Sequence, residues 1–178
     1  MEEPIWTNLL QGVLPRPCFE RPFVCEGFPS DSVAIVIGEN PATPMSSDWW
    51  SYWNEDVGFN YRKFVKDYLI DRQELGKRIS NTRRRLDRIR ESGIKVVETN
   101  AYRNEKLDGL GDETSNYDLL NLLISNMPRL KAVIAHGKHA GAFLGAVSFP
   151  EGVKTYKTRH FRSESYAVLD SICESIAS

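Results

Sequence analysis

Four short stretches of the chain are rich in hydrophobic residues, and polar residues follow each of them. They cover residues 33–37, 94–99, 130–135 and 153–158. The first and third are nearly continuous aliphatic runs, which is typical of central parallel strands covered on both faces. The fourth alternates polar and hydrophobic residues, which favours an edge strand with one face in water. The pattern therefore predicts four β-strands.

Segments with helical spacing of their hydrophobic residues lie between and after these strands. The predicted helices cover residues 59–72, 80–92, 117–127, 138–147 and 163–176. Gly93 and Pro128 are expected to end two of them, and Ser163 is the predicted N-cap of the last. Strands that alternate with helices imply crossover connections between parallel strands. We therefore expect an α/β fold, a three-layer α/β/α sandwich with a short, four-stranded, mostly parallel central sheet.

The first part of the chain does not follow this alternation. Residues 1–31 are rich in proline and aromatic residues without regular periodicity, so an irregular N-terminal segment is predicted there. The length of 178 residues suits one domain, and we expect residues 1–178 to form a single unit. Tryptophans crowd residues 49–53, where most rings are expected in the core and one or two in a pocket.

Charge and cysteine usage narrow the possible classes of protein. The formal net charge is −1, so a polyanion would have to bind a local patch such as the arginine-rich residues 72–90. The alternative for these arginines is a solvated helix face paired with Asp87 and Glu91. The three cysteines form no CxxC pair, which argues against a disulfide framework, a four-cysteine zinc site and an iron–sulfur cluster. No stretch approaches the roughly 20 apolar residues that span a bilayer, and we expect a cytoplasmic protein without a membrane partner.

Polar residues follow each predicted strand, and ligands of such folds bind at the carboxyl ends of parallel strands. Gly38 to Pro44 forms a loop stiffened by two prolines, which can hold Glu39 or Asn40 as a general base or water-positioning group. An ordinary Asn-Pro turn is the alternative. Asn100 ends the second strand and carries both an amide donor and an acceptor, which suits an imide or amide edge of a ligand.

The histidines are His136, His139 and His160. A zinc site needs three or four ligands, and no carboxylate neighbours the first two in the sequence, so we expect neither metal nor cofactor. His160 stands at a strand-to-helix turn, where an imidazole can stabilise developing negative charge. The chain lacks both GxxxxGK[ST] and GxGxxG, which argues against a P-loop and a dinucleotide fingerprint.

Two of these segments resemble the motifs of the uracil-DNA glycosylase superfamily. Gly38-Glu39-Asn40-Pro41-Ala42 is similar to its first motif, Gly-x-Asp/Asn-Pro, which follows the first strand. The segment His160-Phe161-Arg162-Ser163-Glu164-Ser165 more loosely resembles its second motif, which begins with His and carries Ser. Phe161 and Arg162 replace prolines of that motif. The resemblance covers roughly residues 32–177 and implies a short parallel sheet between helices.

The resemblance also implies roles for individual residues. Asn40 would orient the attacking water beside Glu39, His160 would stabilise the departing base anion, and Asn100 would read the base. The expected substrate pocket is completed by Gly38, Pro41, Tyr102 and a stacking ring from Trp50 or Trp53. The residues expected at the DNA backbone are Arg162, Ser163, Ser165 and Lys138.

The function that this resemblance implies is hydrolysis of the N-glycosidic bond of a damaged or deaminated base in DNA, as in DNA repair. Such an enzyme takes the base out of the stack and into a pocket. Two alternatives stay open at this point: a nucleic-acid-binding or base-binding protein without catalysis, and a hydrolase of a small nucleoside-like glycoside. The partner expected for the first two is single- or double-stranded DNA, and the sequence makes no prediction of the oligomeric state.

Overall fold

A five-stranded sheet forms the centre of the computed structural model, which describes residues 5–41, 43, 45–103 and 115–178. The strand order is β1-β5-β2-β6-β7. Four neighbouring strands are parallel, namely β5 (Val96–Asn100), β2 (Ala34–Gly38), β6 (Ala132–His136) and β7 (Lys154–Thr158), while β1 (Phe23–Val24) is antiparallel to β5. The α/β class with a mostly parallel sheet is therefore confirmed, and β7 lies at an edge as predicted.

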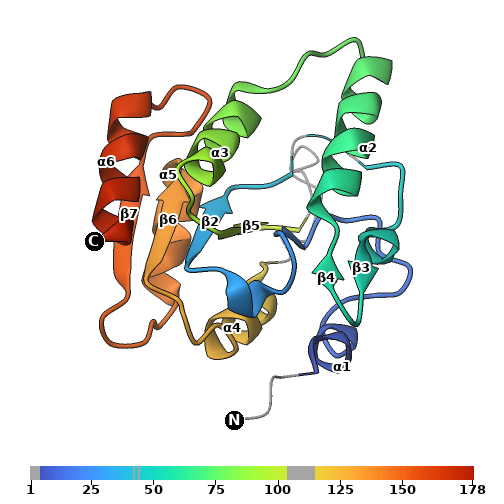
Figure 1. The fold of residues 1–178 in the computed structure, drawn as a ribbon, viewed down its shortest axis with the longest axis horizontal. Coiled ribbons are helices and arrows are strands. Elements are labelled where there is room, and N and C mark those ends of the chain that lie inside the picture. The colour runs from blue at the N-terminus through green and yellow to red at the C-terminus, as the bar shows by residue number, and fades with distance from the viewer. Residues whose placement is uncertain (1–4, 42, 44, 104–114) are drawn as a thin grey trace.

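Hydrophobic side chains cover both faces of the sheet. Ile35 and Ile37 of β2 belong to one hydrophobic cluster, and Val36 belongs to the other, as expected for alternating side chains. Helices α3 (Asn81–Glu91) and α6 (Tyr166–Ala177) cover the face nearer the viewer in Figure 1. The opposite face packs against α4 (Tyr117–Ser125), α5 (Lys138–Phe143), the 3₁₀ turn η3 (Leu144–Ala146) and aromatic rings from the first part of the chain.

The sheet has five strands, not the four that were predicted, because the segment 1–31, which was expected to be irregular, contributes a further strand. This segment contains α1 (Trp6–Gln11), β1 and the 3₁₀ turn η1 (Pro29–Asp31). Phe23 pairs with Thr99 and Val24 with Glu98, and both hydrophobic side chains are fully buried. A strand of two residues is too short to show an alternating pattern, so periodicity alone does not reveal it.

Several element boundaries also differ from the predictions. The tryptophan-rich stretch forms the 3₁₀ turn η2 (Trp49–Tyr52), followed by the hairpin strands β3 (Trp53–Asn54) and β4 (Gly58–Phe59). Phe59 thus belongs to a strand, and α2 (Tyr61–Glu74) begins after Asn60, whose side chain accepts a hydrogen bond from the Lys63 N–H. The predicted helix 138–147 consists of α5 and η3.

The N-cap of α6 is Ser165, not Ser163 as predicted. The Ser165 hydroxyl accepts a hydrogen bond from the Val168 N–H, as a cap requires. Ser163 instead donates its N–H and its hydroxyl to the His160 carbonyl oxygen in the preceding turn. The glycine predicted to end the second helix does follow α3, with Gly93 at a φ of 86°.

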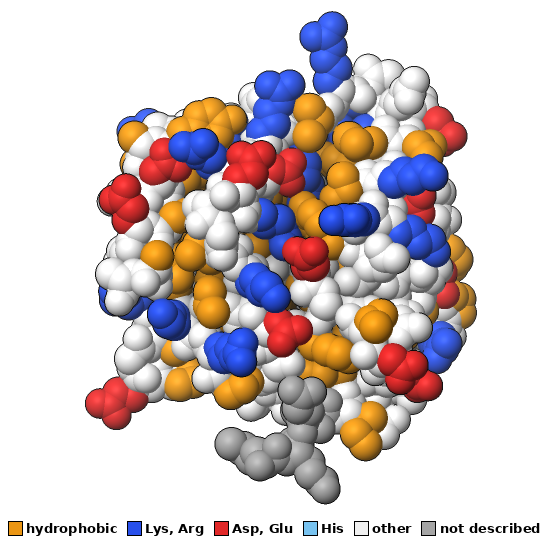
Figure 2. Space-filling view, in the orientation of Figure 1, with side chains coloured by type: hydrophobic (Ala, Val, Ile, Leu, Met, Phe, Trp, Pro, Cys, Tyr) orange, Lys and Arg blue, Asp and Glu red, His pale blue; other side chains and the backbone are white. Residues whose placement is uncertain are grey.

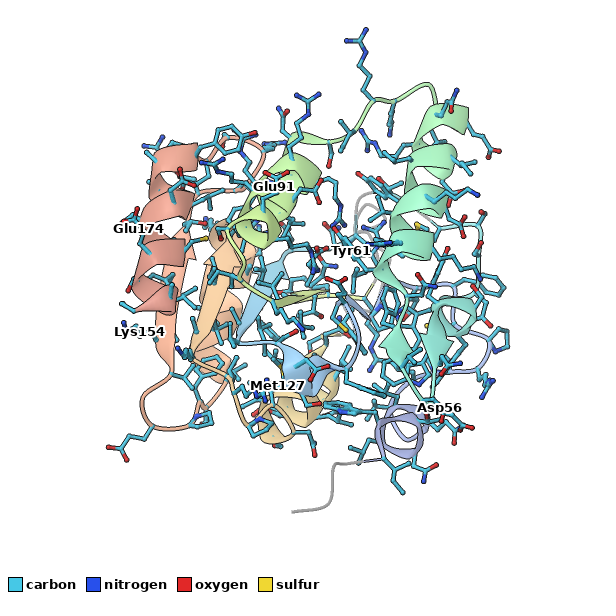
Figure 3. All side chains as sticks on the ribbon, viewed as in Figure 1. Asp56, Tyr61, Glu91, Met127, Lys154 and Glu174 are labelled. Carbon is cyan, nitrogen blue, oxygen red and sulfur yellow. The ribbon has the colours of Figure 1, made fainter. Side chains whose placement is uncertain are left out.

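A side-chain hydrogen bond links helices α2 and α3, which also follow one another in the chain. Tyr61, labelled at the start of α2 in Figure 3, donates its hydroxyl proton to Asp87 Oδ1 of α3 at 3.0 Å.

Within the described ranges, no helix has the length and hydrophobicity needed to cross a membrane. Cys18, Cys25 and Cys173 are all buried and carry free thiols.

Candidate functional site

A pocket of about 160 Å³ lies at the carboxyl ends of β2, β5 and β6. Strands β2, β6 and β7 run toward the top of Figure 1, and the connection between α2 and α3 lies at the top of the same view. One part of the lining carries residues at or just after the ends of strands, namely Glu39, Asn40, Pro41, Asn100, His136 and His160. The other part carries hydroxyl, aromatic and charged side chains, among them Arg21, Thr43, Tyr68, Arg72, Ser80, Thr82, Arg83 and Glu98.

Gly38 allows the side chains of Asn100 and His136 to approach the end of β2. The parallel register places Gly38 opposite Asn100. A Cβ atom at position 38 would lie 2.8 Å from Asn100 Oδ1 and 3.0 Å from His136 Nε2, so a larger residue would displace one of them. The side chain of Asn116 donates to the Asn100 carbonyl oxygen at 2.9 Å and holds the end of β5. The lack of a side chain at Gly38 therefore leaves the room that the side chains of Asn100 and His136 occupy.

The loop after β2 is held by backbone hydrogen bonds to the segment after β5. The Ala101 N–H donates to the Gly38 carbonyl oxygen at 2.8 Å, and the Tyr102 N–H donates to the Glu39 carbonyl oxygen at 3.0 Å. Glu39 Oε1 also lies 3.6 Å from His139 Nε2. These contacts fix the backbone that carries Glu39 and Asn40 beside the pocket.

Two neutral imidazoles face each other at this site. His136 and His160 have ring centres 5.0 Å apart with nearly perpendicular planes. Burial, and secondly the charge of His160, lowers the pKa of His136 to about 3. Burial, followed by the charge of Arg162, lowers the pKa of His160 below its ordinary value. Both rings are therefore uncharged at neutral pH.

Hydrogen bonds to the other ring nitrogens assign the tautomers. His136 Nδ1 accepts a hydrogen bond from the Phe161 N–H at 3.3 Å, and His160 Nδ1 accepts one from the Arg162 N–H at 3.2 Å. A neutral imidazole with an accepting Nδ1 carries its proton on Nε2. Each ring thus offers a neutral Nε2–H donor, which is the form needed to stabilise a developing oxyanion without prior deprotonation.

Most residues predicted at the strand ends reach this pocket. Asn40, Glu39, Pro41, Asn100 and His160 line it, and Gly38 lies at its edge. Tyr102, which was also expected in the pocket, is not among the described residues that line it. Its N–H donates to the Glu39 carbonyl oxygen, and its ring centre lies 6.5 Å from that of Phe143.

The two tryptophans predicted to stack on a base lie elsewhere. The indole N–H of Trp50 donates to the Pro15 carbonyl oxygen at 2.8 Å, and that of Trp53 donates to Thr7 Oγ1 at 3.0 Å. Both pack against Trp49 in an aromatic cluster. Neither ring is among the described residues that line the pocket, where Tyr68 supplies the aromatic surface. Trp50 is buried and Trp53 is partly buried, and both indole N–H groups already have partners, so these rings serve in packing.

The residues predicted at the DNA backbone lie in three places. Arg162 lines an open groove next to the pocket, together with His160 and Asn40. Lys138 and Ser163 line a separate hollow on the other side of His160. Ser165 is used as the cap of α6 and does not line any of these hollows in the described part of the chain.

A buried ionic network under the pocket was not predicted. Arg83 Nη1 donates to both Glu98 oxygens at 2.7 and 2.8 Å, and Arg90 donates to Glu98 Oε1 at 2.9 and 3.1 Å. Burial would raise the pKa of Glu98, but Arg83 and Arg90 together hold it below its usual value. The sequence feature that could have indicated this network is a lone glutamate, Glu98, within the hydrophobic stretch 94–99. Asp87, which was suggested as an ion-pair partner of the arginines, accepts a hydrogen bond from the Tyr61 hydroxyl instead.

His136 ends β6 and lines the pocket, but it was not predicted as a catalytic or substrate-binding residue. The sequence placed it among the polar residues at the strand ends, and it was also considered as a metal ligand beside His139. In the part of the chain that the structure describes, no group of three or more His, Cys, Asp or Glu side chains is arranged to hold a metal ion. The strand-end position was the signal that should have placed His136 with Asn40 and Asn100.

The buried neutral His136 predicts a loss of stability in acid. Its pKa of about 3 lies below the unfolded value of about 6.5, so the unfolded chain binds the extra proton first as the pH falls. The free energy of unfolding is expected to fall by roughly 1 kcal/mol per pH unit from this residue below pH 6.5. Urea denaturation at several pH values should show that the free energy of unfolding depends less steeply on pH for His136→Asn than for the unmodified protein. Asparagine keeps an acceptor for the Phe161 N–H. An unchanged slope in that variant would contradict the assignment.

Comparison of the chain with models of known protein families and with curated protein sequences gave no match.

Proposed function

We propose that the protein is a DNA glycosylase-like hydrolase that cleaves the N-glycosidic bond of a damaged or deaminated, uracil-type base. The observation that supports this best is the position of Asn40, Asn100 and His160, which come from three different strand ends and line one pocket. The proposal includes the three-layer α/β/α arrangement of the superfamily, a cytoplasmic location and a role in DNA repair.

The chemistry of the pocket suits this reaction. The C–N bond breaks and its electron pair leaves with the base, while water adds to C1′ of the sugar and loses a proton; the departing base takes up one proton in turn, so that the step balances. The side-chain amide of Asn40 orients the water, and the neutral Nε2–H of His160 stabilises the negative charge on a base oxygen. Asn100 pairs with the amide edge of the base through its own amide. His136 offers a second neutral donor beside Asn100.

An open groove of about 710 Å³ adjoins the pocket and shares Glu39, Asn40 and His160 with it. Four cationic side chains line the groove, namely Arg72, Lys77, Arg78 and Arg162. Figure 2 shows Lys and Arg side chains projecting at the top of the view, over the connection between α2 and α3. The first part of the arginine-rich stretch thus lies on the side of the pocket, which supports DNA phosphates as ligands of the groove.

Removing the two exposed groove cations is expected to weaken the salt dependence of DNA binding. For Lys77→Ala/Arg78→Ala, the magnitude of the slope of log affinity against log salt should decrease by about 1.4 to 1.8, since each phosphate contact contributes roughly 0.7 to 0.9. The matched control, Arg84→Ala/Lys95→Ala, removes the same charge from exposed positions outside the groove. Fluorescence anisotropy with labelled oligonucleotides at several salt concentrations measures both slopes, and equal slopes for the two variants would refute a groove contact.

A base-excision assay tests the proposed reaction. Purified protein is incubated with labelled single- and double-stranded oligonucleotides that carry uracil, hypoxanthine, xanthine or a thymine mismatch. Alkali then cleaves the strand at any abasic site. Excision of one of these bases is expected. Binding without excision of any of them, by a protein of native circular dichroism, would instead support a base-binding protein and reject hydrolysis.

A further inference from the structure

Two guanidinium groups at the inner part of the pocket have unused donors. The Nε atoms of Arg21 and Arg83 are inaccessible to solvent and have no hydrogen-bond partner within the described ranges. Both residues line the pocket. A buried donor without a partner costs about 1 to 3 kcal/mol, and more when it is charged, so such atoms are rare unless a ligand satisfies them.

The surroundings hold these two groups in place. The guanidinium carbon of Arg21 lies 5.6 Å from the ring centres of both Phe64 and Tyr68, and that of Arg83 lies 5.6 and 5.2 Å from the same rings. Arg21 Nη2 also donates to the Thr43 carbonyl oxygen. The two arginines are therefore positioned by stacking and hydrogen bonds before any ligand arrives.

This end of the pocket carries an excess of positive charge. Arg83 and Arg90 share the single carboxylate of Glu98, and Arg21 has no carboxylate among its hydrogen-bond partners in the described chain. Asp71, the next acidic residue, accepts two hydrogen bonds from Ser46. Burial, and next the positive charge of Arg83, lowers the pKa of Arg21 to about 10. An anion beside Arg21 would relieve this repulsion.

We infer that the inner end of the pocket is an oxyanion subsite, in which a carboxylate or phosphate oxygen accepts hydrogen bonds from Arg21 and Arg83. Ser80 and Thr82 line the same pocket and add polar residues to this end of it. The oxyanion is either a free inorganic ion or an acidic substituent on a nucleobase. The subsite requires only that the pocket binds a ligand, and it does not depend on cleavage of a glycosidic bond.

Calorimetric titrations with inorganic phosphate, orotate and uracil distinguish the two sources. Orotate carries a carboxylate on the ring that uracil presents without charge. Tighter binding of orotate than of uracil, by about tenfold or more, supports an acidic nucleobase. Binding of phosphate without any preference for orotate supports a free oxyanion. Arg21→Gln should remove either effect, while the exposed Arg16→Gln should retain it.

Side-chain NMR of the unmodified protein gives an independent readout. The Nε–H resonances of Arg21 and Arg83 are expected to shift on titration with the anion that binds, because each proton gains an acceptor. Absence of both a shift and a calorimetric signal at millimolar phosphate and orotate would overturn the subsite. Equal anion affinity of Arg21→Gln, with an unchanged melting temperature, would do the same. Loss of base excision alone, by contrast, would leave these binding results unaffected.

Discussion

Substitution of Asn40 by alanine is expected to slow base excision by about 100- to 1,000-fold. Asn40 lines both the pocket and the groove, and its backbone is fixed by the hydrogen bonds that Gly38 and Glu39 accept. Loss of one group that positions the attacking water has a cost of this size in other hydrolases. Single-turnover excision from the preferred oligonucleotide measures the rate of the chemical step without product release.

Two further variants separate positioning of water from damage to the fold. Asn40→Asp places a carboxylate at the same position and should retain excision, because a carboxylate both orients water and accepts its proton. Asn121→Ala removes an amide from α4, outside the pocket, and should leave the rate unchanged. A rate for Asn40→Ala within a few-fold of that of the unmodified protein would exclude Asn40 from the reaction.

Substitution of Glu98 by glutamine is expected to lower the free energy of unfolding by about 3 to 5 kcal/mol. Glutamine keeps the shape of the side chain but leaves Arg83 and Arg90 without a buried counter-charge. Breaking a buried ion pair by removing one partner typically costs this much. Urea denaturation followed by circular dichroism measures the change, and a comparable m-value shows that the unfolding transition is the same.

The ion pair between Arg88 and Asp170 provides a matched comparison. Its nitrogen and oxygen atoms lie 2.9 Å apart, but both side chains are exposed. Water and salt weaken such a pair, so Asp170→Asn should change the stability little. Equal losses of stability in Glu98→Gln and Asp170→Asn would show that burial does not set the strength of the Glu98 network.

The central strands could be predicted because each is a local hydrophobic run. Residues 33–37 and 130–135 lie in the middle of the sheet, with a hydrophobic cluster on each face, so their pattern and their environment agree. The edge strand β1 could not be predicted in the same way. Phe23 and Val24 form a strand only because β5 offers them a partner, and that partner is far away in the sequence.

The residues of the site could be predicted where the topology of the sheet determines their positions. Parallel strands place their carboxyl ends together, and this brought Asn40, Asn100 and His160 to one pocket from positions 120 residues apart at the extremes. The positions of Trp50 and Trp53 depend instead on how a loop packs, and a run of tryptophans alone does not distinguish a core from a pocket. Arg21 and Arg83 reach the pocket from outside the strands, so no strand-end rule selects them.

The two edges of the sheet are closed to self-association in different ways. The edge strand β1 is only two residues long, which leaves few free backbone groups for another chain to pair with. At the other edge, Lys154 and Lys157 of β7 are exposed, and a second β7 would bring like charges together. Without β1, the buried hydrophobic strand β5 would become a bare edge, and copies of the chain could pair through it as they do in aggregates. The short segment at Phe23 and Val24 thus protects the sheet against aggregation.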